Sequence, residues 1–412
     1  STLSPSSAAS DVYKRQVVKM KVYIEAYGCP ANFNDAEIVK GLLVTKGFDI
    51  VSSPNDAKIL IIFTCIVKTP TEHRMIDRIK KLSSLNKPII IAGCMPVAER
   101  EIVEKICPHA SLMGPGSILK VVEIVEKTLS KEKVVAIEFE KIPKLCLPKL
   151  RRNPVINIVQ ISEGCSWRKC SYCIVKLARG EFFSYPLELI VKEVEQSLKE
   201  GCKEIWLTSQ DTGCYGIDIG TNLAELLQRV TTVDGEFFVR VGMMNPTYVK
   251  DILNELIEAF KNPKVFKFLH IPVQSGSNEI LKAMKRGYSV EDFEKIVKAF
   301  RQEFPMLTLS TDIIVGFPGE SEEDFEQTLR LLERTRPDIV NISKFSPRPK
   351  TEASKLKQLN ANMIKERSKR LKKIVQQIQE KNNEKWLGWE GRILVDEVGK
   401  HNTFVGRNFA YK

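Results

Sequence analysis

Three cysteines lie close together in the stretch EGCSWRKCSYC, at Cys165, Cys170 and Cys173. A structural zinc site usually takes four protein ligands, and the neighbouring sequence offers neither a fourth cysteine nor a histidine. Three thiolates instead suit a [4Fe-4S] cluster that leaves one iron open for an exogenous ligand. The spacing therefore predicts an iron-sulfur cluster, with a zinc site or a chance grouping as the alternatives.

A second set of cysteines is spread along the first part of the chain. Cys29, Cys65 and Cys94 each follow an apolar, strand-like run, namely KVYIEAYG, KILIIFTC and PIIIAGC. In an open parallel sheet, ligands bind beyond the carboxyl ends of the strands. We expect these three thiols to meet at one sheet edge. The other four cysteines have no such pattern and are predicted to be small buried hydrophobes.

The elements that must position these thiols are of the α/β class. From residue 20 to 130, strand-like runs alternate with helical patterns, which predicts an N-terminal domain with a parallel sheet covered by helices. The stretch 131–154 is basic and contains prolines, so it is predicted to connect two domains.

A second alternating series spans residues 155–385 and contains six strand candidates. Six βα units in succession predict a partial barrel, written (βα)6, whose site lies at the carboxyl-terminal face. Cys165 comes directly after the first of these strands, so its cluster is expected over the barrel mouth. The final residues, 386–412, alternate like two antiparallel strands and are predicted to be part of a small β domain.

The composition limits the possible partners. The chain has 412 residues, 43% of them hydrophobic and 28% charged, which is typical of a globular protein of two or three domains. The longest apolar run, residues 59–67, is much shorter than the about 20 residues of a membrane span, so no membrane partner is expected. The net charge of +12 favours a polyanion such as nucleic acid.

One helical stretch concentrates this charge. Residues 361–385 contain eight Lys or Arg against three Glu. The functional interpretation is contact with RNA phosphates, and the alternative is a solvated helix face. The residues predicted to contact RNA are Lys369, Arg370, Lys372 and Lys373.

Sparse cysteines without a signal segment indicate a reduced, cytoplasmic protein. The Ser-rich residues 1–19 are expected to be a disordered leader. Their DVYKRQ string resembles the translation of a transposon adapter from sequencing libraries, which would make Met20 the native start.

Together, the barrel triad, TSQDTG, IPVQSGS, DIIVGFPGE, SPRPKT, and the N-terminal motifs YGCPANFNDAE and AGCMP resemble the radical S-adenosylmethionine methylthiotransferases. The likeness covers nearly everything from Met20 onward. The stretches TCIVKTPTEHRM and EGCSWRKCSYCIVKLARG are similar to the archaeal and eukaryotic branch that modifies N6-threonylcarbamoyladenosine in tRNA. The resemblance implies an enzyme that converts this nucleoside, 3′ of the anticodon, to its 2-methylthio derivative.

The resemblance also implies the cofactors. The barrel cluster would bind S-adenosylmethionine and help to generate a radical from it, and a second [4Fe-4S] cluster on Cys29, Cys65 and Cys94 would hold the transferred sulfur. A flavodoxin- or ferredoxin-type reductant and a sulfur donor are the further implied partners. The small β domain resembles a TRAM-like RNA-binding barrel. Residues matching the cofactor-binding positions for S-adenosylmethionine are Ser209, Gln210, Asp211, Gln274, Ser275 and Asp312.

The sequence departs from the family at two places. The barrel triad has the spacing C-x4-C-x2-C, one residue longer than usual between the first pair, and Phe63 stands where asparagine is usual. Two same-chemistry alternatives are methylthiolation of isopentenyladenosine in tRNA or of a ribosomal-protein aspartate. An alternative of another class is a non-catalytic RNA-binding protein with a structural metal.

Overall fold

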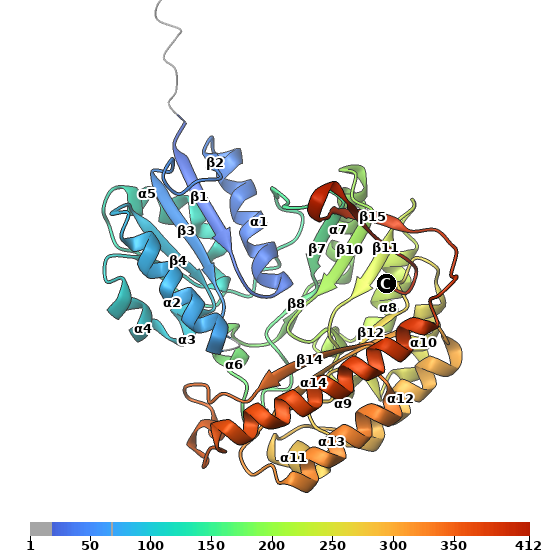
Figure 1. The fold of residues 1–412 in the computed structure, drawn as a ribbon. Coiled ribbons are helices and arrows are strands. Elements are labelled where there is room, and N and C mark those ends of the chain that lie inside the picture. Colours follow the sequence, from blue (N-terminus) through green and yellow to red (C-terminus); the bar gives the residue numbers. More distant parts are fainter. Residues whose placement is uncertain (1–18, 67–68) are drawn as a thin grey trace, which may run out of the picture.

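The N-terminal unit is a parallel six-stranded sheet between two layers of helices (Figure 1). The computed structural model describes residues 19–66 and 69–412, so the predicted leader lies outside it except for Lys19. The strand order is β2-β1-β3-β4-β5-β6. The strands are β1 (Lys21–Ala26), β2 (Asp49–Val51), β3 (Ile59–Thr64), β4 (Ile89–Gly93), β5 (Ser111–Met113) and β6 (Val135–Ala136), and the helices are α1 (Pro30–Thr45), α2 (Thr69–Ser83), α3 (Met95–Ala98), α4 (Arg100–Ile106), η2 (Pro115–Lys120) and α5 (Val121–Leu129).

The sheet is apolar on both faces because helices cover both. Every residue of β3 is buried. Alternate side chains of β3 enter different cores, with Leu60 packed in the cluster that includes Met75 and Ile79 of α2, and Ile61 packed in the cluster of α1 and α5. The face of α2 that carries Met75 and Ile79 is therefore part of the core.

The second unit is the predicted partial barrel of six parallel strands, which confirms the expected fold class. Two three-stranded sheets, β11-β10-β7 and β12-β13-β14, meet through a bridge between Val239 and Val265. The strands are β7 (Ile156–Gln160), β10 (Glu204–Thr208), β11 (Phe238–Val241), β12 (Phe268–His270), β13 (Thr308–Val315) and β14 (Ile339–Lys344). The helices are α7 (Leu187–Lys199), α8 (Leu223–Thr231), α9 (Pro246–Val249), α10 (Leu253–Lys261), α11 (Asn278–Ala283), α12 (Val290–Glu303), α13 (Glu322–Thr335) and α14 (Ala361–Glu384).

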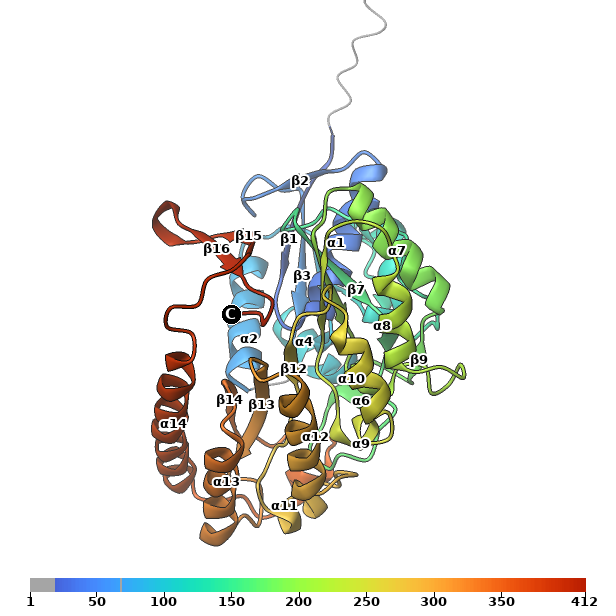
Figure 2. The same cartoon turned by 90° about the vertical axis from the view of Figure 1, so that its right-hand side faces the viewer.

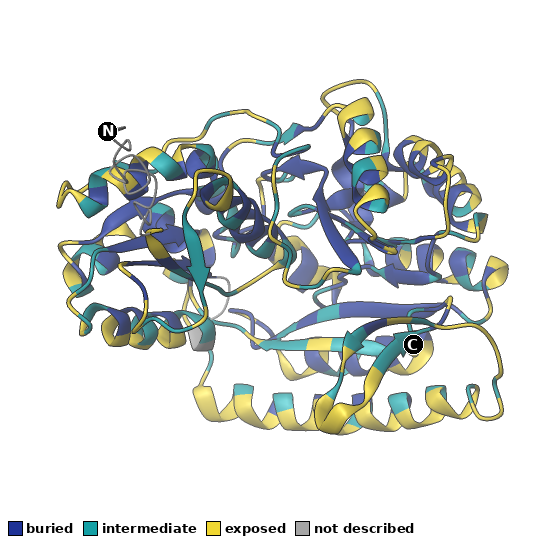
Figure 3. Cartoon of the chain, turned by 90° about the horizontal axis from the view of Figure 1, so that it is seen from above, coloured by how far each residue is buried: buried dark blue, intermediate teal, exposed yellow. Residues whose placement is uncertain are grey.

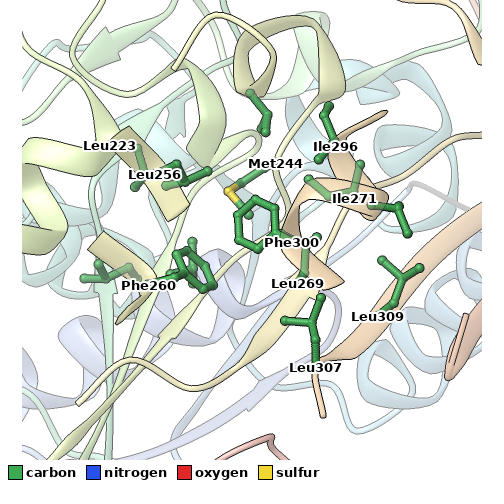
Figure 4. Packing of buried hydrophobic residues seen from close by; sticks show 14 of the residues in the cluster. Leu223, Met244, Leu256, Phe260, Leu269, Ile271, Ile296, Phe300, Leu307 and Leu309 are labelled. Carbon is green, nitrogen blue, oxygen red and sulfur yellow. The ribbon is translucent and has the colours of Figure 1, made fainter. Parts of the chain in front are cut away.

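The barrel helices pack on the strands through aliphatic and aromatic side chains (Figure 4). Phe260 of α10 and Phe300 of α12 meet edge to face, with ring centroids 5.2 Å apart. Helix α13 begins with a capping box, in which the side chains of Ser321 and Asp324 each accept a hydrogen bond from the other's backbone N–H. The outer face of the long α14 is exposed, whereas the inner strands β3, β4 and β7 are buried (Figure 3).

The predicted connection, residues 131–154, packs between the two units. Its β6 pairs with β5 and extends the N-terminal sheet. Two of its lysines are buried in ion pairs: Lys144 with Asp35 of α1, and Lys149 with Glu193 of α7. A third buried pair joins Arg348, after β14, to Glu99. The two units are therefore held by charged contacts from several segments.

The C-terminal residues form the predicted antiparallel hairpin, β15 (Leu394–Val398) and β16 (Phe404–Arg407). The hairpin projects from the body of the molecule in Figure 2. At its base, Val395 and Phe404 line a cavity together with Trp206 of β10. Tyr411 packs against Phe266 and Phe268, and the Arg240 guanidinium lies over the Tyr411 ring. Among the described residues, none of the helices combines the length and the apolar character needed to cross a membrane.

We predict that Glu204, at the start of β10, makes stability depend on pH. Burial, with a contribution from the neighbouring Asp396, raises the pKa of this carboxyl to about 7. A raised acid pKa means that the folded state holds the proton more tightly, so the free energy of unfolding should fall as pH rises from about 4.5 to 7 and be level above it.

Glu204→Gln should remove much of this dependence and gain on the order of 2 kcal/mol over the native chain at pH 8. Thermal unfolding of both proteins at pH 5 and pH 8 measures the difference. Exposed Glu195→Gln on α7 is the control and should behave like the native chain. An equal pH dependence in the native and Glu204→Gln proteins would contradict the assignment.

Candidate active site

The N-terminal triad lies at the carboxyl edge of the sheet. Cys65 and Cys94 follow the paired ends of β3 and β4, and the Cys94 N–H donates to the Thr64 carbonyl at 3.1 Å. Cys29 caps the start of α1. Gly28 has φ +113°, and a Cβ at this position would lie 2.7 Å from the Cys65 Cβ, so only glycine lets the two loops approach. The structure thus brings the three predicted cysteines together.

Two of these thiols, Cys65 and Cys94, are buried, whereas Cys29 is exposed. The pKa of Cys94 is raised to about 12, first by burial, with Cys29 and Cys65 adding to the rise and Arg179 opposing it. Three thiolates this close to one another repel unless a cationic centre joins them. The donor set therefore fits an iron cluster that binds all three sulfurs.

The barrel triad lies in the loop between β8 (Ser162–Glu163) and α6 (Val175–Ala178). The pKa of Cys165 is raised by burial and by the Asp211 carboxylate, and that of Cys173 is raised to about 11 by burial and by Cys170. The Arg286 guanidinium donates to the Cys170 sulfur at 3.1 Å. These three thiols also lie within electrostatic reach of one another.

The extra residue in the C-x4-C spacing is accommodated by a well-anchored loop. The Trp167 indole donates to the Lys285 carbonyl at 2.9 Å, and Gly287 leaves room for its ring. Arg168 donates to the Gly180 carbonyl at 2.6 Å. The loop between the first two cysteines is therefore anchored to two separate segments of the chain, at Lys285 and at Gly180.

The second departure, Phe63, has a packing role. Its side chain is fully buried in the core between the sheet, α1 and α5, directed away from the α2 face. An asparagine here would need a hydrogen-bond partner in an apolar layer. In this chain the position contributes to the core.

Neither triad is arranged as a site for a single ion. Within residues 19–66 and 69–412, no three His, Cys, Asp or Glu side chains converge as ligands of one metal ion. Two thiolates on one tetrahedral ion lie about 4 Å apart, whereas in an iron-sulfur cluster each thiolate binds a different iron and the sulfurs lie further apart. Three thiolates without a fourth protein ligand fit a cluster that leaves one iron open.

A cavity of about 980 Å³ opens beside the barrel triad. Cys173 lies in its wall together with two predicted cofactor-binding residues, Gln274 and Asp312. Asp312 accepts a hydrogen bond from the Asn341 amide at 2.7 Å and lies 3.3 Å from the His270 ring. Gln274 adopts φ +70° between two backbone hydrogen bonds with β13, so its strained conformation is imposed by the sheet.

The remaining predicted cofactor-binding residues have mixed surroundings. Ser209, Gln210 and Asp211 follow β10 near Cys165, and Asp211 accepts from the backbone N–H groups of Gly213 and Asn245, both at 3.0 Å. One oxygen each of Gln210 and Asp211 is buried without a hydrogen-bond partner among the described residues, so both oxygens are available to a ligand. Ser275 is buried and contacts Ser277 and Thr328, outside the cavity lining.

The predicted RNA-contacting residues of α14 have three kinds of surroundings. Lys372 lines the 980 Å³ cavity. Lys369 pairs with Glu366, and Arg370 pairs with two glutamates of α13, so part of their charge is compensated within the protein. Lys373 is exposed. This arrangement does not test whether the four residues contact RNA, so their assignment to RNA binding stays a prediction.

Three cationic residues at the site were missed from the sequence. Arg286 contacts Cys170, Arg179 contacts Cys94, and Lys344 at the end of β14 lines the large cavity. Arg179 belongs to the KLARG stretch that carried the family resemblance, six residues after Cys173, and this proximity was an available signal. The other two lie far from either triad in sequence.

Comparison with known proteins agrees with this geometry. Residues 159–332 match the radical SAM superfamily, and residues 21–114 match the uncharacterized protein family UPF0004. A probable threonylcarbamoyladenosine tRNA methylthiotransferase of Pyrococcus horikoshii is 47% identical over 396 residues, covering 95% of this chain and 92% of the relative. The chain belongs to the threonylcarbamoyladenosine tRNA methylthiotransferase family. The human threonylcarbamoyladenosine tRNA methylthiotransferase is 38% identical over 401 residues, covering 95% of this chain and 68% of that protein.

Solved structures support the fold. A radical S-adenosylmethionine methyltransferase from Kitasatospora setae, solved with cobalamin and a [4Fe-4S] cluster bound, aligns with a TM-score of 0.60 at 14% identity, covering 82% of this chain and 77% of that one. At this identity the likeness concerns the fold alone. The cofactors of the methylthiotransferase family are S-adenosylmethionine and two [4Fe-4S] clusters, and the two three-thiol donor sets fit both clusters.

We predict that each triad holds its cluster independently. Anaerobic reconstitution with iron and sulfide should load about eight irons per chain. Cys65→Ala and Cys170→Ala should each load about four, because each removes a ligand from one cluster only. Iron and acid-labile sulfide assays measure the loading, and Cys107→Ala, a buried cysteine outside both triads, should keep the full amount. Stoichiometric zinc in place of iron would contradict the cluster assignment.

Proposed function

We propose that this enzyme converts N6-threonylcarbamoyladenosine in tRNA to its 2-methylthio derivative. The observation that carries the proposal is the 980 Å³ cavity beside Cys173, whose lining includes Gln274, Asp312, Lys344 and Lys372. Its volume is at the upper end of the about 300–1,000 Å³ typical of ligand pockets, which suits a nucleoside together with a cofactor. The names of the archaeal and human relatives supply the substrate class.

The protein's contribution is to hold and orient the reactants. When bound, S-adenosylmethionine and the clusters supply the radical and sulfur chemistry. The unpartnered oxygens of Gln210 and Asp211 near Cys165 suit a cationic amino group, and Asp312, held by Asn341, faces the cavity. A target base must leave its stack to enter such a pocket, as an unpaired anticodon-loop base can.

The lysines of the cavity favour this substrate over the nearest alternative. The threonylcarbamoyl group carries a carboxylate, whereas an isopentenyl group is apolar. Lys344 and Lys372 line the cavity from β14 and α14, and neither forms an ion pair within the described chain. An ammonium group beside a carboxylate forms a charge-assisted hydrogen bond, which an apolar substituent would leave unmade. We assign these two lysines to recognition of the modified base.

The further partners belong to this proposal as well. The reaction requires an external electron source and a continuing supply of sulfur, so we propose a flavodoxin- or ferredoxin-type reductant and a separate sulfur donor. All ten cysteines are free of disulfides, in keeping with a reducing compartment, and we propose the cytoplasm.

Nucleoside analysis tests the reaction directly. Deleting the gene should abolish 2-methylthio-N6-threonylcarbamoyladenosine in bulk tRNA and leave its unmethylthiolated precursor in place. Mass spectrometry of digested tRNA measures both. Re-expression of the native gene is the positive control. Loss of a methylthiolated isopentenyladenosine, or of a modified ribosomal aspartate, would assign the enzyme to the corresponding alternative instead.

The recognition role of the lysines is tested by binding. The native chain should bind an anticodon stem-loop with threonylcarbamoyladenosine more tightly than the same RNA with adenosine. The Lys344→Met, Lys372→Met double variant should reduce this ratio of affinities about tenfold. Lys373→Met is the matched control on the same helix. It should weaken binding of both RNAs equally and flatten the salt dependence if it meets a phosphate. An unchanged preference in the double variant would remove the lysines from substrate recognition.

A further inference from the structure

Four charged side chains are buried where the N-terminal unit meets the barrel. They are Asp35 of α1, Lys144 of the connection, Glu163 of β8, and Arg179 just after α6. Their side chains are at most 6% exposed. Burying four charges is costly unless each is closely paired, so their presence needs an explanation beyond packing.

The four groups form a closed ring of ion pairs. Lys144 contacts both carboxylates at 2.7 Å, and the Arg179 guanidinium contacts both at 2.9 Å. Burial alone would raise the pKa of Glu163, but the two cations hold it at about 2. The ring pairs two acidic side chains with two basic ones, and its contacts hold the Arg179 guanidinium between Asp35 and Glu163.

Arg179 also reaches the N-terminal triad. Its guanidinium forms a hydrogen bond with Cys94 and lies within electrostatic reach of Cys29. A second nitrogen contacts the Asn32 amide oxygen at 3.4 Å, and the Asn32 amide nitrogen donates to the Tyr27 and Thr64 carbonyls. Those two carbonyls belong to the loops that carry Cys29 and Cys65. One side chain from the barrel unit thus contacts the cysteine site of the other unit.

We propose that Arg179 is a positioning residue for the N-terminal cluster and raises its reduction potential. A cationic donor next to a ligating sulfur favours the more negative, reduced state of the cluster. Because Arg179 lies six residues after Cys173, the loop that forms one triad supplies the cation at the other. The inference rests on the cluster and is independent of which RNA the enzyme modifies.

The competing role is purely structural, in which the ring only joins the two units. The two roles predict different effects on the reduction potential of the cluster. Removing a structural ion pair that is distant from the sulfurs would leave this potential unchanged. Lys149 offers the matched control. Like Lys144 it is a buried cation of the connection between the units, and it pairs with Glu193 of the barrel unit at 2.6 Å.

The test uses the full chain with Cys165, Cys170 and Cys173 replaced by alanine, so that only the N-terminal cluster assembles. After anaerobic reconstitution with iron and sulfide, a dithionite titration followed by electron paramagnetic resonance gives the potential. In this background, Arg179→Met should lower the ratio of reduced to oxidised cluster about tenfold at a fixed solution potential. This change is equivalent to 59 mV for one electron. Lys149→Met should leave the ratio unchanged.

Two further variants keep the test decisive. Asp35→Asn retains Arg179 but removes a compensating negative charge, so the ratio should shift the opposite way. Arg179→Lys keeps the charge with fewer donors and should shift it less than Arg179→Met. If Arg179→Met does not fold, the directions in which these two variants shift the reduction potential decide between the two roles. Unchanged potentials in every variant that loads four irons would overturn the proposal and leave the ring a structural feature.

Discussion

The constraint on which the structure depends is the common direction of its strands. Parallel strands end on one edge of a sheet, so residues that follow different strands meet there although they are far apart in sequence. Cys65 and Cys94 follow the paired residues Thr64 and Gly93 in this way. The barrel repeats the arrangement with a single loop after its first strands. The N-terminal unit thereby gathers three thiols from separate loops, whereas the barrel unit gathers three from one local motif.

A second constraint is the contact between the units. Asp35 of the N-terminal unit pairs with Lys144 of the connection and with Arg179 of the barrel unit, and Glu99 pairs with Arg348 of the barrel unit. Buried pairs of this kind add less to stability than to specificity of geometry, because their attraction is offset by desolvation. A rigid interface suits a reaction in which two cofactor sites must act on one base. The large cavity beside Cys173 also includes His73 of the N-terminal unit in its lining.

Much of the fold was predictable because its signals are local. Apolar runs marked the strands before the three N-terminal cysteines, and the close spacing in EGCSWRKCSYC marked the barrel triad. The contacts of Arg179 with Asp35 and of Arg286 with Cys170 join residues 144 and 116 positions apart, and no local pattern encodes such pairs. Ser275 lies outside the cavity lining and accepts a hydrogen bond from the Ser277 N–H, and its cofactor contact stays a prediction.

The central claim is that two separate three-thiol sites each hold a cluster with one open iron. Electron paramagnetic resonance of the reduced, reconstituted protein tests it most directly. The account predicts two distinguishable cluster signals, of which only the one lost in Cys173→Ala changes when S-adenosylmethionine is added. A single signal, or one that responds to S-adenosylmethionine and survives Cys173→Ala, would contradict it.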